Sequence, residues 1–147
     1  MLVSGAPGAG KSALIEEVRR AWAEAGGVSY ATVGLPQPIP APYQIWYPIW
    51  RALLGLRTYD DPFRDGARLA ANLQTRLPHL SRTAAIFQNL LGVQQQEAAS
   101  LEMLEAPTRQ KLILDATVGL LEYAAQRAPV LLTFESLQTV DSASRAL

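Results

Sequence analysis

Apolar residues recur at helical spacing just after a short glycine-rich stretch near the N-terminus. They fall at positions 14, 15, 18, 22 and 25 with charged residues between them, which predicts an amphipathic helix. Gly26 and Gly27 follow, where a helix end favours residues that adopt a left-handed backbone. The β-branched and aromatic segment 28–33 predicts a strand, and the apolar lead Met1–Ser4 predicts another strand before the glycines. We therefore expect strand, loop, helix and strand in that order.

The middle of the chain is mostly helical in pattern. Prolines alternate from Pro36 to Pro42, which prevents a regular ladder of backbone hydrogen bonds and predicts an extended loop. Apolar spacing then predicts three helices, a turn or two near Leu101 and Leu104, and a long helix from Pro107 to Ala128. The three helices are expected around 48–54, from an Asp61 cap to Leu77, and around 83–91, and the four helix ends coincide with Gly55, Pro78, Gly92 and Pro129.

A second apolar strand is predicted close to the C-terminus. Residues Val130–Phe134 are apolar apart from Thr133, and Glu135 ends the run. Strands alternating with helices indicate an α/β fold.

Composition limits the classes of function. Of 147 residues 49% are hydrophobic and 18% are charged, which fits one globular domain with a sizeable core. Thirteen Lys and Arg balance thirteen Asp and Glu, so no net field draws the chain to nucleic acid or anionic lipid. With no Cys and one His, thiol chemistry and Cys-based or His-based metal sites are disfavoured. No apolar run approaches a membrane span, and the N-terminal residues lack the charged region and apolar stretch of a signal peptide, so we expect a cytoplasmic protein.

One motif carries specific chemistry. The pattern G-x-x-x-x-G-K-[ST] is matched, between a predicted strand and a predicted helix, by Gly5, Ala6, Pro7, Gly8, Ala9, Gly10, Lys11 and Ser12. The glycines would let backbone N–H groups surround phosphate oxygens, and the helix start adds its positive dipole end. Lys11 would reach the β- and γ-phosphates of ATP, and the Ser12 hydroxyl would ligate Mg²⁺. The alternative is a glycine-rich helix start without a ligand.

A phosphate-binding loop of this kind needs an acidic partner at the end of an apolar strand, and Glu135 is placed to hold the metal or its waters. We therefore predict Lys11 and Glu135 as catalytic residues, and Ser12 with Glu135 as the metal ligands. Ser136 stands where a second carboxylate would help to activate water. The alternative is an ordinary buried strand that ends in a solvated glutamate.

Two further groups of side chains could contact a ligand. The first is an aromatic cluster of Trp46, Tyr47 and Trp50, which could stack on an adenine base. Aromatic residues at helical spacing more often belong to the hydrophobic core. Arg109 and Lys111 near a helix start could contact phosphate, although solvated charge is the commoner role.

Three blocks of the chain resemble one known family. They are Gly5–Glu17, Ala41–Gly55 and Ala128–Asp141, of which the middle block is the most diagnostic. Together they resemble the P-loop ATPase module of the STAND group of AAA-like proteins, found in large bacterial transcription activators and multidomain nucleotide cyclases. The resemblance covers nearly the whole chain.

The resemblance implies a P-loop NTPase-like three-layer α/β fold with a parallel sheet and a large helical insertion. The family's sheet has five strands, and this chain ends at Leu147 before the strand that follows the acidic block. We therefore expect a single, truncated P-loop ATPase domain over 1–147, without the sensor residues or trailing helical domain. Its expected parts are strand, P-loop, helix and strand in 1–34, a proline-rich loop and helical segment in 35–128, and the acidic-strand block in 129–147.

Two departures from the family bear on activity. Glu135 and Asp141 match, but Ser136 replaces an acid and Thr139 replaces a Trp. The resemblance thus implies ATP·Mg²⁺ binding with weak or absent hydrolysis, in a regulatory module that acts as a signalling or transcription switch. Its expected partners are other domains or subunits of a multidomain regulator, without direct contact to nucleic acid or a membrane. The alternatives are a P-loop small-molecule kinase and an interaction fragment that binds nothing.

Overall fold

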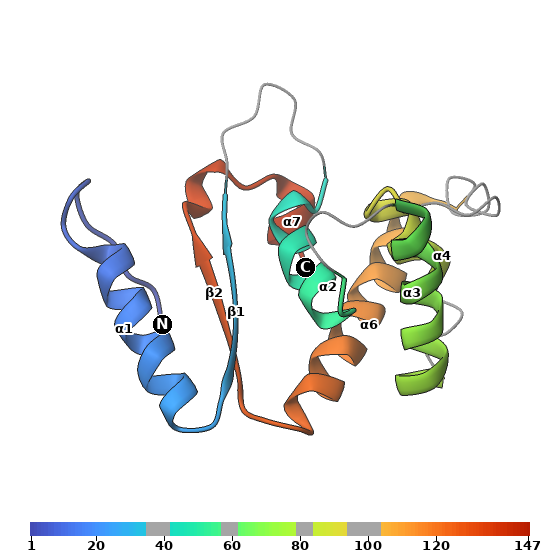
Figure 1. The fold of residues 1–147 in the computed structure, drawn as a ribbon. Helices are drawn as coiled ribbons and strands as arrows, with labels where there is room; N and C mark the ends of the chain where they lie inside the picture. The colour runs from blue at the N-terminus through green and yellow to red at the C-terminus, as the bar shows by residue number, and fades with distance from the viewer. Residues whose placement is uncertain (35–41, 57–61, 79–83, 94–103) are drawn as a thin grey trace.

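Two parallel strands form the middle of the molecule, with helices on both sides (Figure 1). The computed structural model describes residues 1–34, 42–56, 62–78, 84–93 and 104–147. In chain order the elements are α1 (Lys11–Glu24), β1 (Val28–Val33), the 3₁₀ turn η1 (Gln44–Trp46), α2 (Tyr47–Leu53), α3 (Pro62–Arg76), α4 (Ala84–Leu90), α6 (Ala106–Ala125), β2 (Val130–Glu135), the 3₁₀ turn η3 (Leu137–Thr139) and α7 (Ser142–Arg145).

The two strands pair in parallel along their whole length. Val28 lies opposite Val130 and Val33 lies opposite Glu135, so both strands end at the same edge. A parallel pair needs a long crossover, and residues 34–129 with their helices supply it. The expected mixed α/β class with a parallel sheet is therefore confirmed.

The strand expected at Met1–Ser4 is not formed. Residues 1–6 have no regular secondary structure, and within the described part of the chain the sheet contains β1 and β2 only. Leu2 is 82% exposed. A strand is held by hydrogen bonds to a neighbouring strand, and a short apolar segment cannot supply these bonds by itself. The opening unit is therefore loop, helix and strand.

The hydrophobic core lies on one side of the sheet, between the strands and α2, α3, α4 and α6. Trp50 is fully buried, and its ring packs edge-on against Phe87 at a centroid distance of 5.6 Å. Trp46 is 8% exposed and packs edge-on against Phe134 of β2, at 5.1 Å. These contacts confirm the core interpretation for Trp46 and Trp50 and leave neither ring free for an adenine base. Tyr47 beside them is half-buried.

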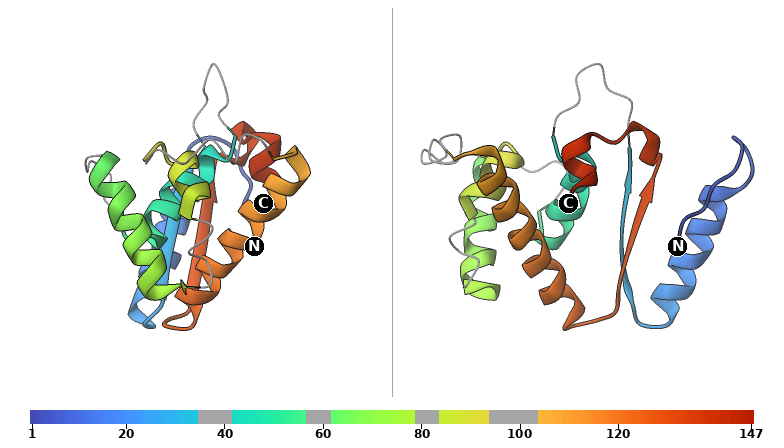
Figure 2. Two further views of the ribbon diagram at one scale, coloured as in Figure 1. Left: turned by 90° about the vertical axis from the view of Figure 1, so that its right-hand side faces the viewer. Right: turned by 180° about the vertical axis from the view of Figure 1, so that it is seen from behind.

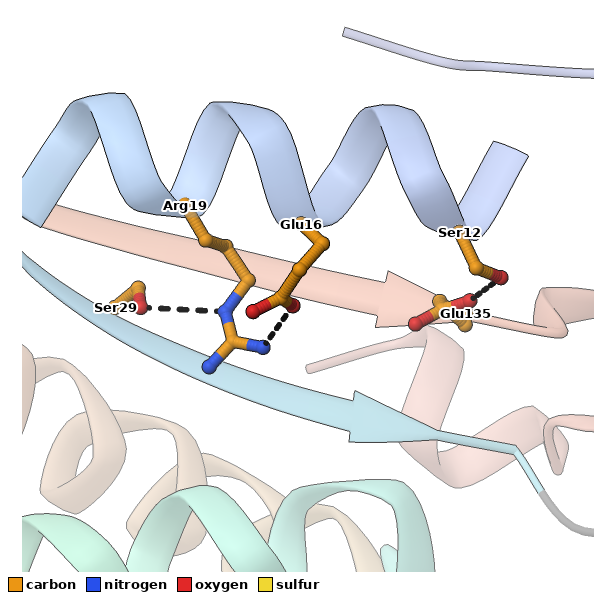
Figure 3. Close-up of polar contacts among 5 residues, drawn as sticks. All are labelled: Ser12, Glu16, Arg19, Ser29 and Glu135. Atoms are coloured by element: carbon orange, nitrogen blue, oxygen red, sulfur yellow. Dashed lines mark hydrogen bonds and ion pairs between the residues drawn. The ribbon is translucent and has the colours of Figure 1, made fainter. Parts of the chain in front are cut away.

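Helix α1 covers the other face of the sheet, apart from the remaining long helices (Figures 1 and 2). None of its residues is buried, and Leu14 is 47% exposed. Arg19 Nε donates to Ser29 Oγ of β1 at 3.3 Å, as Figure 3 shows. At the other end of the helix Trp22 Nε1 donates to the carbonyl of Pro129 at 3.2 Å. Polar contacts, rather than a buried apolar stripe, therefore place α1 on the sheet.

Most predicted helix ends agree with the structure. Gly26, Gly55 and Gly92 all adopt a positive φ just past α1, α2 and α4, as expected for helix-terminating glycines. The two short C-terminal elements η3 and α7 were not predicted. Most of the loop expected at 36–42, the Asp61 cap and the Leu101 part of the turn expected near Leu101 and Leu104 lie outside the described residues. The division into segments 1–34, 35–128 and 129–147 stays a prediction.

Candidate functional site

The glycine-rich loop is exposed and leads directly into α1. Gly8 and Gly10 have φ values of 80° and 79°, a left-handed backbone that L side chains rarely adopt. Gly5 does not share this conformation, and a Cβ added there would lie 3.4 Å from the Cβ of Ala9. The positive φ therefore requires glycine at positions 8 and 10. Position 5 has no such backbone requirement.

The start of α1 is electropositive. Gly10 is its N-cap, no side chain caps it, and the first turn contains no acidic residue. The N–H of Leu14 is the donor that returns to Gly10, at 3.0 Å, so the N–H groups before it lack helical partners. Unpaired N–H groups and the positive end of the helix dipole favour an anion at this point.

Lys11 lies over the loop that precedes it. Its Nζ donates to the carbonyl oxygens of Gly5 at 2.9 Å and Ala6 at 2.8 Å. The ammonium group is thereby held beside the turn formed by Gly8 and Gly10. A phosphate oxygen could replace either neutral carbonyl with a stronger, charge-assisted hydrogen bond.

Ser12 and Glu135 meet although 123 positions separate them. Ser12 Oγ donates to Glu135 Oε2 at 2.6 Å (Figure 3). Ser12 belongs to the first turn of α1, whereas Glu135 is the last residue of β2. The parallel pairing with β1 sets the position of Glu135, because Gly34 N donates to its carbonyl at 2.8 Å. The structure thus places the two predicted metal ligands side by side.

The chemistry of this pair fits Mg²⁺. A hydroxyl and a carboxylate are hard oxygen donors, and Mg²⁺ is usually bound by one or two carboxylates together with waters and substrate phosphates. No group of three or more His, Cys, Asp or Glu occurs within the parts of the chain that are described. The donor set therefore suits a cation shared with phosphate oxygens better than an all-protein site.

A tight turn after β2 supports Glu135. Ser136 has a φ of 56°, and its carbonyl accepts hydrogen bonds from Thr139 Oγ1 at 2.8 Å and Thr139 N at 3.1 Å. A Cβ added to Gly34 would lie 2.5 Å from Thr139 Oγ1 and 2.7 Å from the Ser136 carbonyl. Sequence reasoning missed Gly34, although a glycine at the end of a strand can signal a close backbone approach.

Asp141 forms hydrogen bonds that hold the C-terminal segment in place. Its carboxylate accepts from Ser144 N at 2.8 Å, which caps α7, and from Tyr43 N at 3.4 Å. Burial raises the pKa of Asp141, but the hydrogen bonds from Ser144 and Tyr43 outweigh it and hold the pKa below its ordinary value. Asp141 therefore ties the C-terminal segment to the residues just before η1.

Lys111, a weaker candidate for phosphate contact, lies on the solvated surface of α6. Its Nζ bonds to Asp115 one helical turn away at 2.8 Å, and both side chains are largely exposed. Lys111 is therefore the solvated charge that the sequence analysis favoured, here paired along the helix.

Comparison with known proteins places the chain in a family. A model of the AAA ATPase domain family matches residues 1–147. The comparisons with curated proteins and with solved structures return no match. In the described residues, no helix has both the length and the apolar character needed to cross a bilayer. Membership indicates nucleotide binding by an AAA-like module, usually with Mg²⁺. Because the match spans the full length given, the chain belongs to the AAA ATPase domain family.

Proposed function

We propose that the loop Gly5–Ser12 binds ATP with Mg²⁺ and that this module is a regulatory switch of the STAND type with weak or absent hydrolysis. The observation that carries the proposal is the 2.6 Å contact between Ser12 Oγ and Glu135 Oε2, next to the loop over which Lys11 lies. One exposed turn is thus next to three groups: the Ser12 and Glu135 oxygens, which suit Mg²⁺, the Lys11 ammonium group, and the positive start of α1.

Each residue of the site has a distinct task in binding. The N–H groups of the loop and of the first turn of α1 hold phosphate oxygens. Lys11 exchanges its hydrogen bonds to the carbonyls of Gly5 and Ala6 for charge-assisted ones to phosphate. Ser12 and Glu135 would hold Mg²⁺, which when bound screens the negative charge of the phosphates.

Weak hydrolysis follows from the residues at the end of β2. Glu135 is the carboxylate there, and Ser12 already donates to it. Ser136 offers a hydroxyl, which cannot accept a proton from water as a carboxylate does. A regulatory switch depends on whether nucleotide is bound rather than on rapid turnover. We propose that the partners which respond are neighbouring domains or subunits of a multidomain regulator.

Calorimetric titration of the chain with ATP and Mg²⁺ tests the nucleotide site. Lys11→Ala should weaken ATP binding by about 10-fold to 100-fold, because it removes charge-assisted hydrogen bonds of about 1.5–3 kcal/mol. Lys111→Ala is the matched control, since it removes an exposed lysine from α6. Equal loss of affinity in both variants would refute the assignment.

A second titration tests the metal ligands. Adding Mg²⁺ should tighten ATP binding to the unmodified chain, and Ser12→Ala or Glu135→Gln should remove most of that gain. Ser29→Ala is the control, because Ser29 faces the same helix but bonds to Arg19 instead. If Mg²⁺ tightens binding equally in all four proteins, Ser12 and Glu135 are not the ligands.

A further inference from the structure

Helix α1 carries one half of the proposed metal site, and the sheet carries the other half. Ser12 lies in the first turn of α1, whereas Glu135 ends β2, and their oxygens are 2.6 Å apart. The phosphate loop leads directly into α1, and Lys11 is the first residue of this helix, so both move with it. A tilt of α1 against the sheet would therefore separate Ser12 from Glu135 while leaving the loop and Lys11 together.

Apolar packing does not fix this tilt, because none of the residues of α1 is buried. The ten residues from Ser12 to Trp22 span about 15 Å along the helix. A tilt of about 10° around the far end would move Ser12 by roughly 2.5 Å, from the length of the helix alone. That displacement is enough to break the contact between Ser12 and Glu135. A restraint at the far end of α1 therefore decides whether the metal site is assembled.

Trp22 supplies a restraint at that end. Its Nε1 donates to the Pro129 carbonyl at 3.2 Å, and the backbone N–H of Val28 donates to the same oxygen at 2.8 Å. This oxygen marks the start of the parallel pair, where Val28 lies opposite Val130. Figure 1 shows α1 leading into β1 at this end of the sheet. The indole thus ties the last part of α1 to the start of both strands, at the opposite end of the sheet from Glu135.

The turn after α1 has room for the indole because residue 27 is glycine. A Cβ added to Gly27 would lie 2.5 Å from Cδ1 and 2.8 Å from Cε2 of the Trp22 ring. The N–H of Gly27 also donates to the Trp22 carbonyl at 2.9 Å. The φ of Gly27 is not positive, so alanine can adopt its backbone, but the alanine methyl group would displace the ring.

Arg19 adds a contact between these two ends of α1. Its Nε donates to Ser29 Oγ at 3.3 Å, and its Nη1 pairs with Glu16 of the same helix at 2.9 Å (Figure 3). A long arginine side chain can follow a small tilt of the helix by changing its rotamers, whereas an indole is short and rigid. Trp22 is therefore the stronger restraint on the tilt.

We infer that Trp22 is a positioning residue for the metal site: it holds the far end of α1 against the start of the sheet and so keeps Ser12 within reach of Glu135. The inference rests on the proposed function of these two residues as metal ligands. Trp22 lies about 15 Å along the helix from Ser12, so it acts through the tilt of α1 and not by contact with the ligand.

Calorimetric titration of ATP, with Mg²⁺ and with a Mg²⁺ chelator, tests this role. In Trp22→Ala the affinity measured in chelator should change less than about twofold, because the loop and Lys11 move with α1. The gain in affinity from Mg²⁺ should fall about fivefold or more, because ligand groups must be held within about 0.5 Å of their working geometry. Gly27→Ala should act in the same direction by displacing the ring, and it serves as the test if Trp22→Ala does not fold. Arg20→Ala is the matched control, since Arg20 is an exposed residue of the same helix that pairs with Glu17.

A second measurement needs no nucleotide. The chain has no cysteine, so Ala13→Cys and Asp115→Cys would place spin labels on α1 and α6 alone. Pulsed electron paramagnetic resonance should give a narrow distribution of distances between the labels, which Trp22→Ala or Gly27→Ala broadens or shifts and Arg20→Ala leaves unchanged. An unchanged Mg²⁺ gain in a folded Trp22→Ala or Gly27→Ala variant, or unchanged label distances, would overturn the inference. Absence of a Mg²⁺ gain in the unmodified chain would instead refute the proposed function, and the label distances would still decide whether Trp22 fixes the tilt of α1.

Discussion

Thr117→Val should destabilise the fold without weakening nucleotide binding. Trp50 Nε1 donates to Thr117 Oγ1 at 2.9 Å, and this hydroxyl in turn donates to the carbonyl of Ile113 at 2.8 Å. Valine has nearly the same shape as threonine but accepts no hydrogen bond. The substitution therefore leaves the packing of α2 against α6 in place and removes the hydroxyl with both of its hydrogen bonds.

The magnitude follows from the burial of both partners. Trp50 is 0% exposed and Thr117 is 2% exposed, so water cannot replace the lost acceptor. An unsatisfied buried donor costs about 1–3 kcal/mol. The Ile113 carbonyl loses less, because the backbone of α6 supplies its regular partner. For a chain of this length the loss corresponds to a fall in melting temperature on the order of 5 °C.

Urea unfolding followed by tryptophan fluorescence measures the change. The unfolding midpoint should fall while the slope with urea stays the same, and ATP affinity below the transition should match that of the unmodified chain. Thr117→Ser is the control, because it keeps the hydroxyl and loses one methyl group. A valine variant as stable as the unmodified chain would refute the reasoning, as would one that binds ATP more weakly.

Three other changes test the site and its supports. Ser136→Asp should leave ATP turnover, measured as phosphate release, well below about one per second, and turnover at the rate of ordinary enzymes in either protein would contradict weak hydrolysis. Gly34→Ala should weaken the effect of Mg²⁺ on ATP binding, because its Cβ would lie 2.5 Å from Thr139 Oγ1 and push the turn after Glu135 aside; an unchanged Mg²⁺ effect would show that this turn does not position the carboxylate. Asp141 should make stability depend on pH in acid: its folded pKa is lowered, so its contribution is complete above its unfolded value near about 4 and is lost as pH falls through the folded pKa. Unfolding midpoints between pH 5 and pH 2 measure this loss, and Asp141→Asn should show a shallower fall over that range.

Local sequence signals predicted the long elements well. The glycines at 26, 55 and 92 follow helix ends because glycine readily adopts the left-handed backbone that ends a helix. Pro129 does the same because proline lacks the N–H that a helical hydrogen bond needs. Short elements escaped the same reasoning. The four residues of α7 are too few for a periodic pattern, and the signal that remained was Asp141 as a capping residue.

Features that depend on distant partners were harder to predict. Met1–Ser4 looks like a strand locally, but a strand exists only where a neighbour pairs with it. The phosphate loop is a local motif, so Lys11 and Ser12 could be picked out directly. The approach of Glu135 to Ser12 depends on the whole crossover between the strands and on the register of Val33 with Glu135. No local pattern encodes that distance.

Because none of its residues is buried, α1 should unfold locally more easily than the core. A segment with few buried apolar contacts opens locally at a lower free-energy cost than the core does. Helix α1 buries no residue, whereas the helices around Trp50 enclose the core, so α1 and its loop should exchange amide hydrogens well before the rest of the chain. A ligand that contacts both Lys11 and Ser12 binds only when α1 and its loop are folded. It therefore stabilises the folded form of this segment by mass action. Nucleotide binding would then change how much of the time α1 is folded, while the core stays unchanged.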